Sequence, residues 1–75
     1  MSRLADLSIG QRGRVVTVLG DDELSARLME MGITPGVEVF LAGAAPLGDP
    51  LELEVRGYRL SVRRSEACRV KVQAI

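Results

Sequence analysis

The sequence contains no histidine and no tryptophan, and it has only one cysteine, one tyrosine and one phenylalanine. Without an imidazole the chain lacks the commonest general base and the commonest transition-metal ligand. The single Cys68 excludes an intramolecular disulfide and a cysteine-rich zinc site, which needs about four ligands. We therefore expect no enzymatic activity and no cofactor, and we assign no catalytic or metal-ligating residue.

The chain also lacks length and long apolar runs. Its 75 residues leave room for one small domain, residues 1–75. The longest uncharged run, residues 39–48, is far shorter than the ~20 residues of a membrane-spanning helix. After Arg3, Asp6 interrupts any apolar segment of a signal peptide. We expect a cytoplasmic protein that does not insert into a membrane.

Net charge is absent as well, because ten basic residues balance ten acidic ones. The balance hides a distribution, since residues 21–54 are strongly acidic and residues 1–20 and 55–75 are basic. This pattern indicates either two charged faces or neighbouring strands that neutralise each other. The zero sum and the scarcity of aromatic rings argue against a nucleic acid as the partner.

Hydrophobic patterning predicts a mainly β protein with one short helix. The helix should run from about Asp22 to Met31, with acidic residues at its start and Gly32 and Pro35 after its end. We expect five strands, the first of them mostly buried, at residues 14–19, 37–42, 51–56, 58–63 and 69–73. Short strands that share one inner face describe a small, strongly bent antiparallel barrel.

The clearest strand pairing is a hairpin across residues 56–57. A two-residue loop there places Glu54 opposite Arg59 and sets the apolar side chains of both strands on one face. A slip by two residues would instead place Glu52 opposite Arg63. Either register brings opposite charges together, so we expect both arginines to have carboxylate partners nearby.

Two features have both a functional and a structural interpretation. Basic neighbours could activate the thiol of Cys68, but we expect this residue to be a small apolar filler at the start of a strand. The acidic run at residues 21–23 could hold a hard cation, but we expect it to cap the helix.

Binding to another protein is the function class that remains. The loop at residues 43–50 is too rich in glycine and proline for a strand, and it should present Leu47 near its tip. Such a loop either docks on a partner or packs on itself. Met29 falls off the apolar stripe of the helix, where it either contacts a partner together with Ala26 or has a minor role in the core.

Three segments resemble a known family. They are LMEMGITPG at residues 28–36, APLGDP at residues 45–50 and GYRLSVRR at residues 57–64, the last followed by Glu66 and Ala67. Over residues 4–72 the sequence resembles the ferrous iron transport protein A family, FeoA. The resemblance implies an SH3-like barrel in the cytoplasm that is required for ferrous iron uptake through the membrane transporter FeoB.

The resemblance also implies where the partner surface lies. By similarity it would lie on the loop after the second strand, with one helix residue beside it: Pro46, Leu47, Gly48, Asp49 and Met29. Family descriptions further attach transition-metal binding, for which this chain offers no histidine.

Three modes of action follow from the resemblance. In the first, the protein is an adaptor that docks on FeoB and promotes transport without contacting iron. In the second, it regulates the GTPase of FeoB, whose cytosolic part carries a G-protein domain, by donating an arginine to the phosphates. We rank the adaptor first because Arg59 and Arg63 are expected to have local carboxylate partners. In the third, it is a metal-regulatory barrel of the repressor type that acts in trans.

Overall fold

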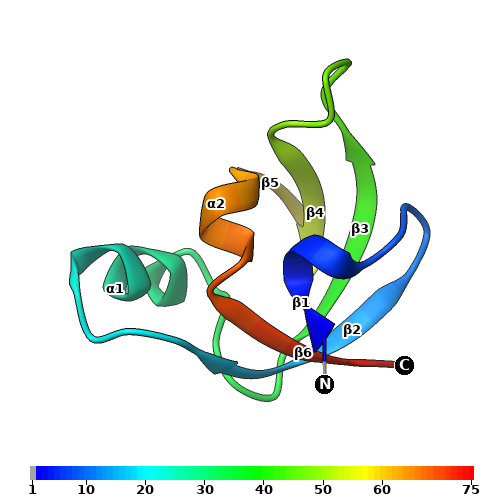
Figure 1. Ribbon diagram of the computed structural model, residues 1–75. Helices are drawn as coiled ribbons and strands as arrows, with labels where there is room; N and C mark the ends of the chain where they lie inside the picture. Colours follow the sequence, from blue (N-terminus) through cyan, green and yellow to red (C-terminus); the bar gives the residue numbers. More distant parts are fainter. Residues whose placement is uncertain (1) are drawn as a thin grey trace.

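Six strands form one antiparallel sheet in the computed structural model, which describes residues 2–75 (Figure 1). The strands are β1 (Ser2–Arg3), β2 (Arg12–Val18), β3 (Glu38–Ala44), β4 (Leu51–Val55), β5 (Tyr58–Val62) and β6 (Val70–Ala74). Their order across the sheet is β1-β6-β2-β3-β4-β5. The helical segments are the 3-10 turn η1 (Leu4–Asp6), α1 (Glu23–Glu30) and α2 (Arg64–Ala67). The mainly β class is confirmed, with the two-residue β1 added to the five expected strands.

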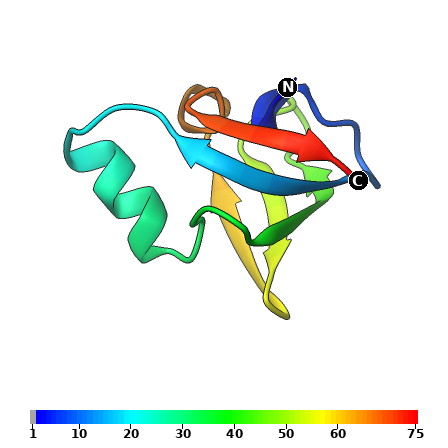
Figure 2. The same ribbon diagram turned by 90° about the horizontal axis from the view of Figure 1, so that it is seen from below.

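The sheet curls around one apolar core. Figure 2 shows β2 and β6 running across the direction of β4 and β5, so that the sheet folds over onto itself. Register shifts in β2 and β3 mark the irregularities that let an antiparallel sheet bend. The buried apolar side chains come from every strand except β1, from η1 and both helices and from adjoining turns: Leu4, Leu7, Val15, Leu28, Ile33, Val39, Leu41, Leu51, Leu53, Val55, Val62, Ala67, Val70 and Val72.

The hairpin across residues 56–57 is confirmed in the register without a slip. Glu54 lies opposite Arg59, and Glu52 lies opposite Ser61. Both turn residues have positive φ, 52° and 86°, as a two-residue turn that matches the twist of its strands requires.

The helix α1 begins and ends where the sequence predicts. Asp22 is its N-cap and accepts a hydrogen bond at Oδ1 from the backbone N–H of Ser25 at 3.3 Å. Leu28 faces the core. At the other end Gly32 has a φ of 103°, in the left-handed region where glycine ends helices.

The first long strand is less buried than expected. In β2 only Gly13 and Val15 are buried, whereas Val16 is 37% exposed. The run of β-branched residues fits a strand, but one face of β2 is open to solvent, so its side chains alternate between core and surface.

A short helix, α2, occupies the segment between the last two strands, residues 64–67. Glu66 Oε1 accepts a hydrogen bond from the backbone N–H of Arg63 at 2.9 Å, which satisfies one of the free donors before the first turn. The helical spacing places Ala67 and Val70 in the core and turns Cys68 outward. The expectation that Cys68 fills the core at a strand start was therefore wrong, because Cys68 is the exposed C-cap of α2.

Within residues 2–75, no helix is long and apolar enough to cross a membrane.

Candidate functional site

The loop between β3 and β4, residues 45–50, extends from the sheet and is here called the tip loop (Figure 1). Pro46 and Leu47 are exposed, and Leu47 is 97% exposed. The base of the loop is closed by hydrogen bonds from Ala45 N to Pro50 O at 3.0 Å and from Gly48 N to Ala45 O at 2.7 Å. The tip loop thus bonds its own backbone and leaves its leucine in solvent.

Arg64 of α2 holds the C-terminal half of the tip loop. Its Nε donates to the carbonyl oxygen of Gly48 at 2.6 Å, and its backbone N–H donates to Asp49 Oδ1 at 3.0 Å. A further bond runs from Arg64 to the carbonyl oxygen of Ala5 at 3.4 Å. Gly48 itself has a φ of 86°, which favours glycine at this position. The loop is therefore held in one shape by its neighbours.

Met29, the fifth residue of the expected partner surface, lies on a different element. It is 43% exposed on α1 and does not belong to the core, so the core role considered for it is not observed. In Figure 1, α2 lies between α1 and the end of the tip loop. The structure brings Pro46, Leu47, Gly48 and Asp49 together and leaves Met29 apart from them.

Two ion pairs occur among residues 2–75. Arg69 donates to Asp22 Oδ1 at 2.6 Å, and Arg59 Nε lies 4.0 Å from Glu54 Oε2 with both side chains largely exposed. The Arg69 hydrogen bond, reinforced by the backbone N–H of Ser25, lowers the pKa of Asp22. The expected neutralisation of Arg59 by Glu54 is thus present, although weak at this distance.

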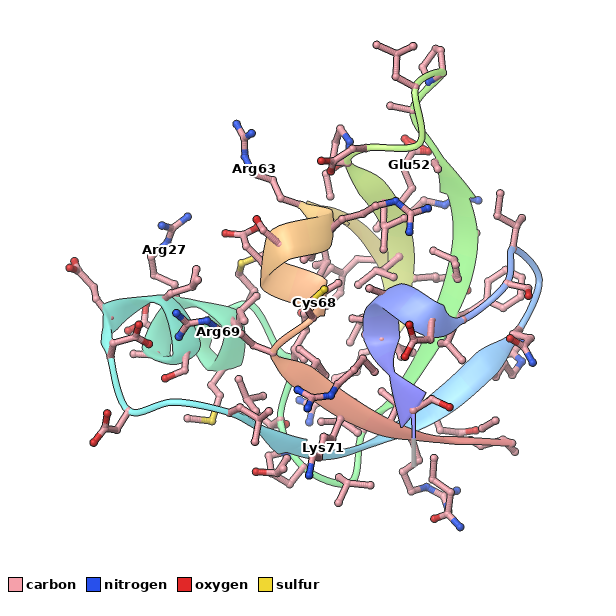
Figure 3. The ribbon with its side chains drawn as sticks, in the orientation of Figure 1. Arg27, Glu52, Arg63, Cys68, Arg69 and Lys71 are labelled. Carbon is pink, nitrogen blue, oxygen red and sulfur yellow. The ribbon has the colours of Figure 1, made fainter. Side chains whose placement is uncertain are left out.

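Arg63 was expected to have a carboxylate partner as well, and this expectation was wrong. The observed register places Ser61, not Arg63, opposite Glu52. Arg63 also lies beyond the end of β5 and before the first residue of α2, where its side chain turns away from the sheet (Figure 3). Within residues 2–75 its guanidinium group forms no ion pair.

A cleft of about 390 Å³ opens beside the tip loop. Its lining comes from α1, the tip loop, β5 and α2: Arg27, Asp49, Pro50, Ser61, Arg63 and Glu66. We call it the arginine cleft. Sequence reasoning missed it because its residues are far apart in the chain. The one local signal for the cleft is that residues 59, 61 and 63 are polar and alternate with apolar residues, which places them on the exposed face of their strand.

Comparison with known proteins gives a consistent result. The FeoA domain family matches residues 2–74. A fusion protein of Porphyromonas gingivalis, the Fe(2+) transport protein A/Fe(2+) transporter FeoB fusion protein, is 33% identical over 73 residues. The match covers 97% of this chain and 9% of the length of the fusion protein.

Two solved structures are similar over nearly their whole length. The FeoA-like protein of Clostridium acetobutylicum is 35% identical with a TM-score of 0.91, covering 100% of this chain and 91% of that one. The FeoA protein of Stenotrophomonas maltophilia, solved with zinc and described as a procaryotic SH3 domain protein, is 32% identical with a TM-score of 0.84, covering 97% and 91%. The fold of the present chain is SH3-like, as expected.

The zinc of the Stenotrophomonas protein prompts a test of the residues present here. Within residues 2–75, no three side chains of the types His, Cys, Asp and Glu gather closely enough to hold a metal ion. The chain has no histidine, and Cys68 lies exposed at the end of α2 (Figure 3). The donor set does not fit a zinc site.

Proposed function

The chain belongs to the FeoA family, and from that premise we propose that it is an accessory protein of ferrous iron transport that docks on the transporter FeoB. The fusion protein of Porphyromonas gingivalis supports this proposal, because it joins a transport protein A segment to a FeoB transporter in one chain. Parts that one chain holds together act at a high effective concentration toward each other. A separate protein of the same family needs a binding surface to reach the same arrangement.

The tip loop is the surface that we propose for docking. The single observation that carries this assignment is Leu47, which is 97% exposed at the end of a loop whose backbone is bonded on both sides. A leucine in this position contributes nothing to the core, but it would bury its whole side chain in a pocket of a partner. Because the loop is already ordered, docking loses little conformational entropy.

In this proposal the protein acts at the cytoplasmic side of the transporter and promotes or regulates transport through contact. The contact surface consists of Pro46, Leu47, Gly48 and Asp49, of which Pro46 and Leu47 supply apolar area. Met29 would add a second, separate contact on α1.

The test is a charged substitution at the loop tip. Leu47→Asp should abolish binding to purified full-length FeoB and ferrous iron uptake in cells, while the melting temperature of the variant stays that of the parent protein. Ile75→Asp is the matched control, because Ile75 is another exposed apolar residue, 62% exposed, that lies outside the tip loop. Normal binding and uptake by Leu47→Asp would refute the tip loop as the docking surface.

Two further measurements complete the test. Met29→Asp reports whether α1 takes part in docking, since a loss of binding would place it in the contact. The GTPase rate of FeoB, measured with and without the protein, separates an adaptor from a regulator of nucleotide turnover. An unchanged rate together with restored transport supports the adaptor.

A further inference from the structure

The arginine cleft holds two guanidinium groups that form no ion pair within residues 2–75, beside the two carboxylates of its lining. Arg27 projects from α1 and Arg63 from the turn before α2; Figure 3 shows both side chains pointing outward on the same side of the molecule, and both line the cleft. Neither guanidinium group forms an ion pair or a hydrogen bond within residues 2–75. The pair therefore has its full donor capacity available for an anion.

The two carboxylates of the cleft are engaged elsewhere. Asp49 Oδ1 accepts the backbone N–H of Arg64 at 3.0 Å. Glu66 Oε1 accepts the backbone N–H of Arg63 at 2.9 Å. These bonds orient both carboxylates toward the start of α2, so they line the cleft without pairing with its arginines.

The floor of the cleft adds donors from the edge of the sheet. β5 is the last strand of the sheet, and no strand among residues 2–75 pairs with its outer side. In the hairpin, Val55 and Tyr58 close the two-residue turn, and hydrogen-bonded pairs alternate from there. Ser61 consequently falls in a non-hydrogen-bonded pair, so its backbone N–H points away from β4.

We propose that the arginine cleft binds the carboxylate side chains of an acidic peptide segment of the docking partner. Arginine pairs with a carboxylate through two parallel hydrogen bonds, and the N–H of Ser61 would add a third donor. Two acidic residues balance the two arginines in the lining, so an anion meets repulsion together with attraction there. A peptide carboxylate would therefore be held by the directional hydrogen bonds of the guanidinium groups and not by the net charge of the cleft.

The position of the cleft connects it to the tip loop. Asp49 and Pro50 belong to the tip loop and also line the cleft, so the two surfaces are continuous. A partner that receives Leu47 in an apolar pocket would place a neighbouring acidic segment over Arg27 and Arg63. This inference rests on the proposed docking function and specifies the chemistry of the partner.

Titration of the isolated protein with peptides tests the cleft directly. The probe is hexaglutamate, with hexaglutamine as the uncharged control and inorganic phosphate as the small anion, followed by nitrogen-15 NMR of backbone amides and arginine Nε–H groups. We expect saturable shifts at Arg27, Arg63 and Ser61 with hexaglutamate alone. Arg27→Gln and Arg63→Gln should each raise the dissociation constant about three- to tenfold. Arg56→Gln, outside the cleft, should leave it unchanged.

The opposite results overturn the assignment. Equal shifts at all exposed arginines would show diffuse attraction, saturable binding of phosphate at the same residues would show a site for small anions, and no shift would show no site. Because this titration uses no FeoB, its outcome is independent of the docking proposal. The uncharged substitution Leu47→Ala should leave hexaglutamate binding unchanged. Arg27→Glu and Arg63→Glu should weaken binding to FeoB most strongly at low salt.

Discussion

Arg64 Nε donates a hydrogen bond to the carbonyl oxygen of Gly48 across 2.6 Å and sixteen positions of the chain. The backbone N–H of Arg64 donates to Asp49 Oδ1, so a single residue of α2 holds two consecutive residues of the tip loop. The shape of the loop therefore depends on the helical turn that follows β5.

Removal of this side chain should loosen the tip loop. In Arg64→Ala we expect faster hydrogen exchange at the amides of Gly48 and Asp49, because the carbonyl of Gly48 loses its partner. The free energy of unfolding should fall by only about 1 kcal/mol, since the bond lies at the surface. Affinity for FeoB should fall less than in Leu47→Asp. Arg63→Ala is the control for exchange, and equal protection of the loop in both variants would contradict the role of Arg64.

Local patterns predicted most of the fold. The acidic cap at Asp22 and the break at Gly32 bounded α1 to within one residue at each end, because helix ends are chosen by nearby side chains. The hairpin register followed from the two-residue turn and from the apolar alternation of its strands, both of which lie within a dozen residues.

The predictions that were wrong concern residues whose positions depend on contacts between distant parts of the chain. Cys68 was placed at the start of the last strand and Arg63 at the end of the strand before it, but α2 turns both outward, Cys68 at its end and Arg63 before its start. The helical turn forms because Ala67 fits the core and Glu66 caps the turn, which is a result of packing against η1 that no short window shows. For the same reason the sequence predicted the tip loop but not the arginine cleft beside it.

Tyr58 links the edge strand to the end of α1. Its hydroxyl group donates to the carbonyl oxygen of Met31 at 2.8 Å. Tyr58→Phe should lower the free energy of unfolding by about 0.5 to 1 kcal/mol, measured by urea denaturation, because the bond is exposed to solvent. An unchanged midpoint would show that water replaces this bond without loss.

Gly32 packs so closely against Tyr58 that the two sites should be coupled. A Cβ atom at Gly32 would lie 2.5 Å from the Tyr58 hydroxyl oxygen, and a φ of 103° adds strain. Gly36 has a similar φ of 91° with nothing near its Cβ position, so Gly36→Ala measures the strain alone, about 1 to 2 kcal/mol. Gly32→Ala should cost more than this. In the Tyr58→Phe background, the extra loss of stability caused by Gly32→Ala over Gly36→Ala should shrink. If the effects of Gly32→Ala and Tyr58→Phe on the free energy of unfolding simply add, there is no clash between the two sites.

The Asp22–Arg69 pair should make stability depend on pH. The Arg69 hydrogen bond holds the pKa of Asp22 below its usual value of 3.8. A carboxyl group whose pKa is lowered by folding contributes stability above its unfolded pKa, and this contribution is lost as the pH falls through the folded pKa. Asp22→Asn keeps a good N-cap but removes the charge. The parent protein should melt at a higher temperature than the variant at neutral pH.

That difference in melting temperature should close as the pH falls from about 5 to about 2. Arg69→Gln should show the same loss, because it removes the other member of the pair. A gap that stays constant over this pH range would mean that the charge of Asp22 plays no part.

The attachment of α1 to the core depends mainly on one apolar side chain. Leu28 is 1% exposed and is the one apolar residue of α1 that is fully buried, whereas its neighbour Met29 is 43% exposed. An eight-residue helix is too short to be stable on its own in water. Leu28→Ala should therefore lower the free energy of unfolding by about 2 to 5 kcal/mol.

Met29→Ala serves as the matched control on the same helix, and its effect on the free energy of unfolding should stay within about 0.5 kcal/mol. If α1 detaches in Leu28→Ala before the sheet unfolds, the urea transition should broaden and its slope should fall, because less surface is exposed in the main step. Arg27 would leave the arginine cleft in that state, so hexaglutamate binding should be lost while the amides of β4 and β5 keep their native shifts. Equal effects of the two substitutions would show that α1 is held by its hydrogen bonds to Arg69 and Tyr58 and not by the burial of Leu28.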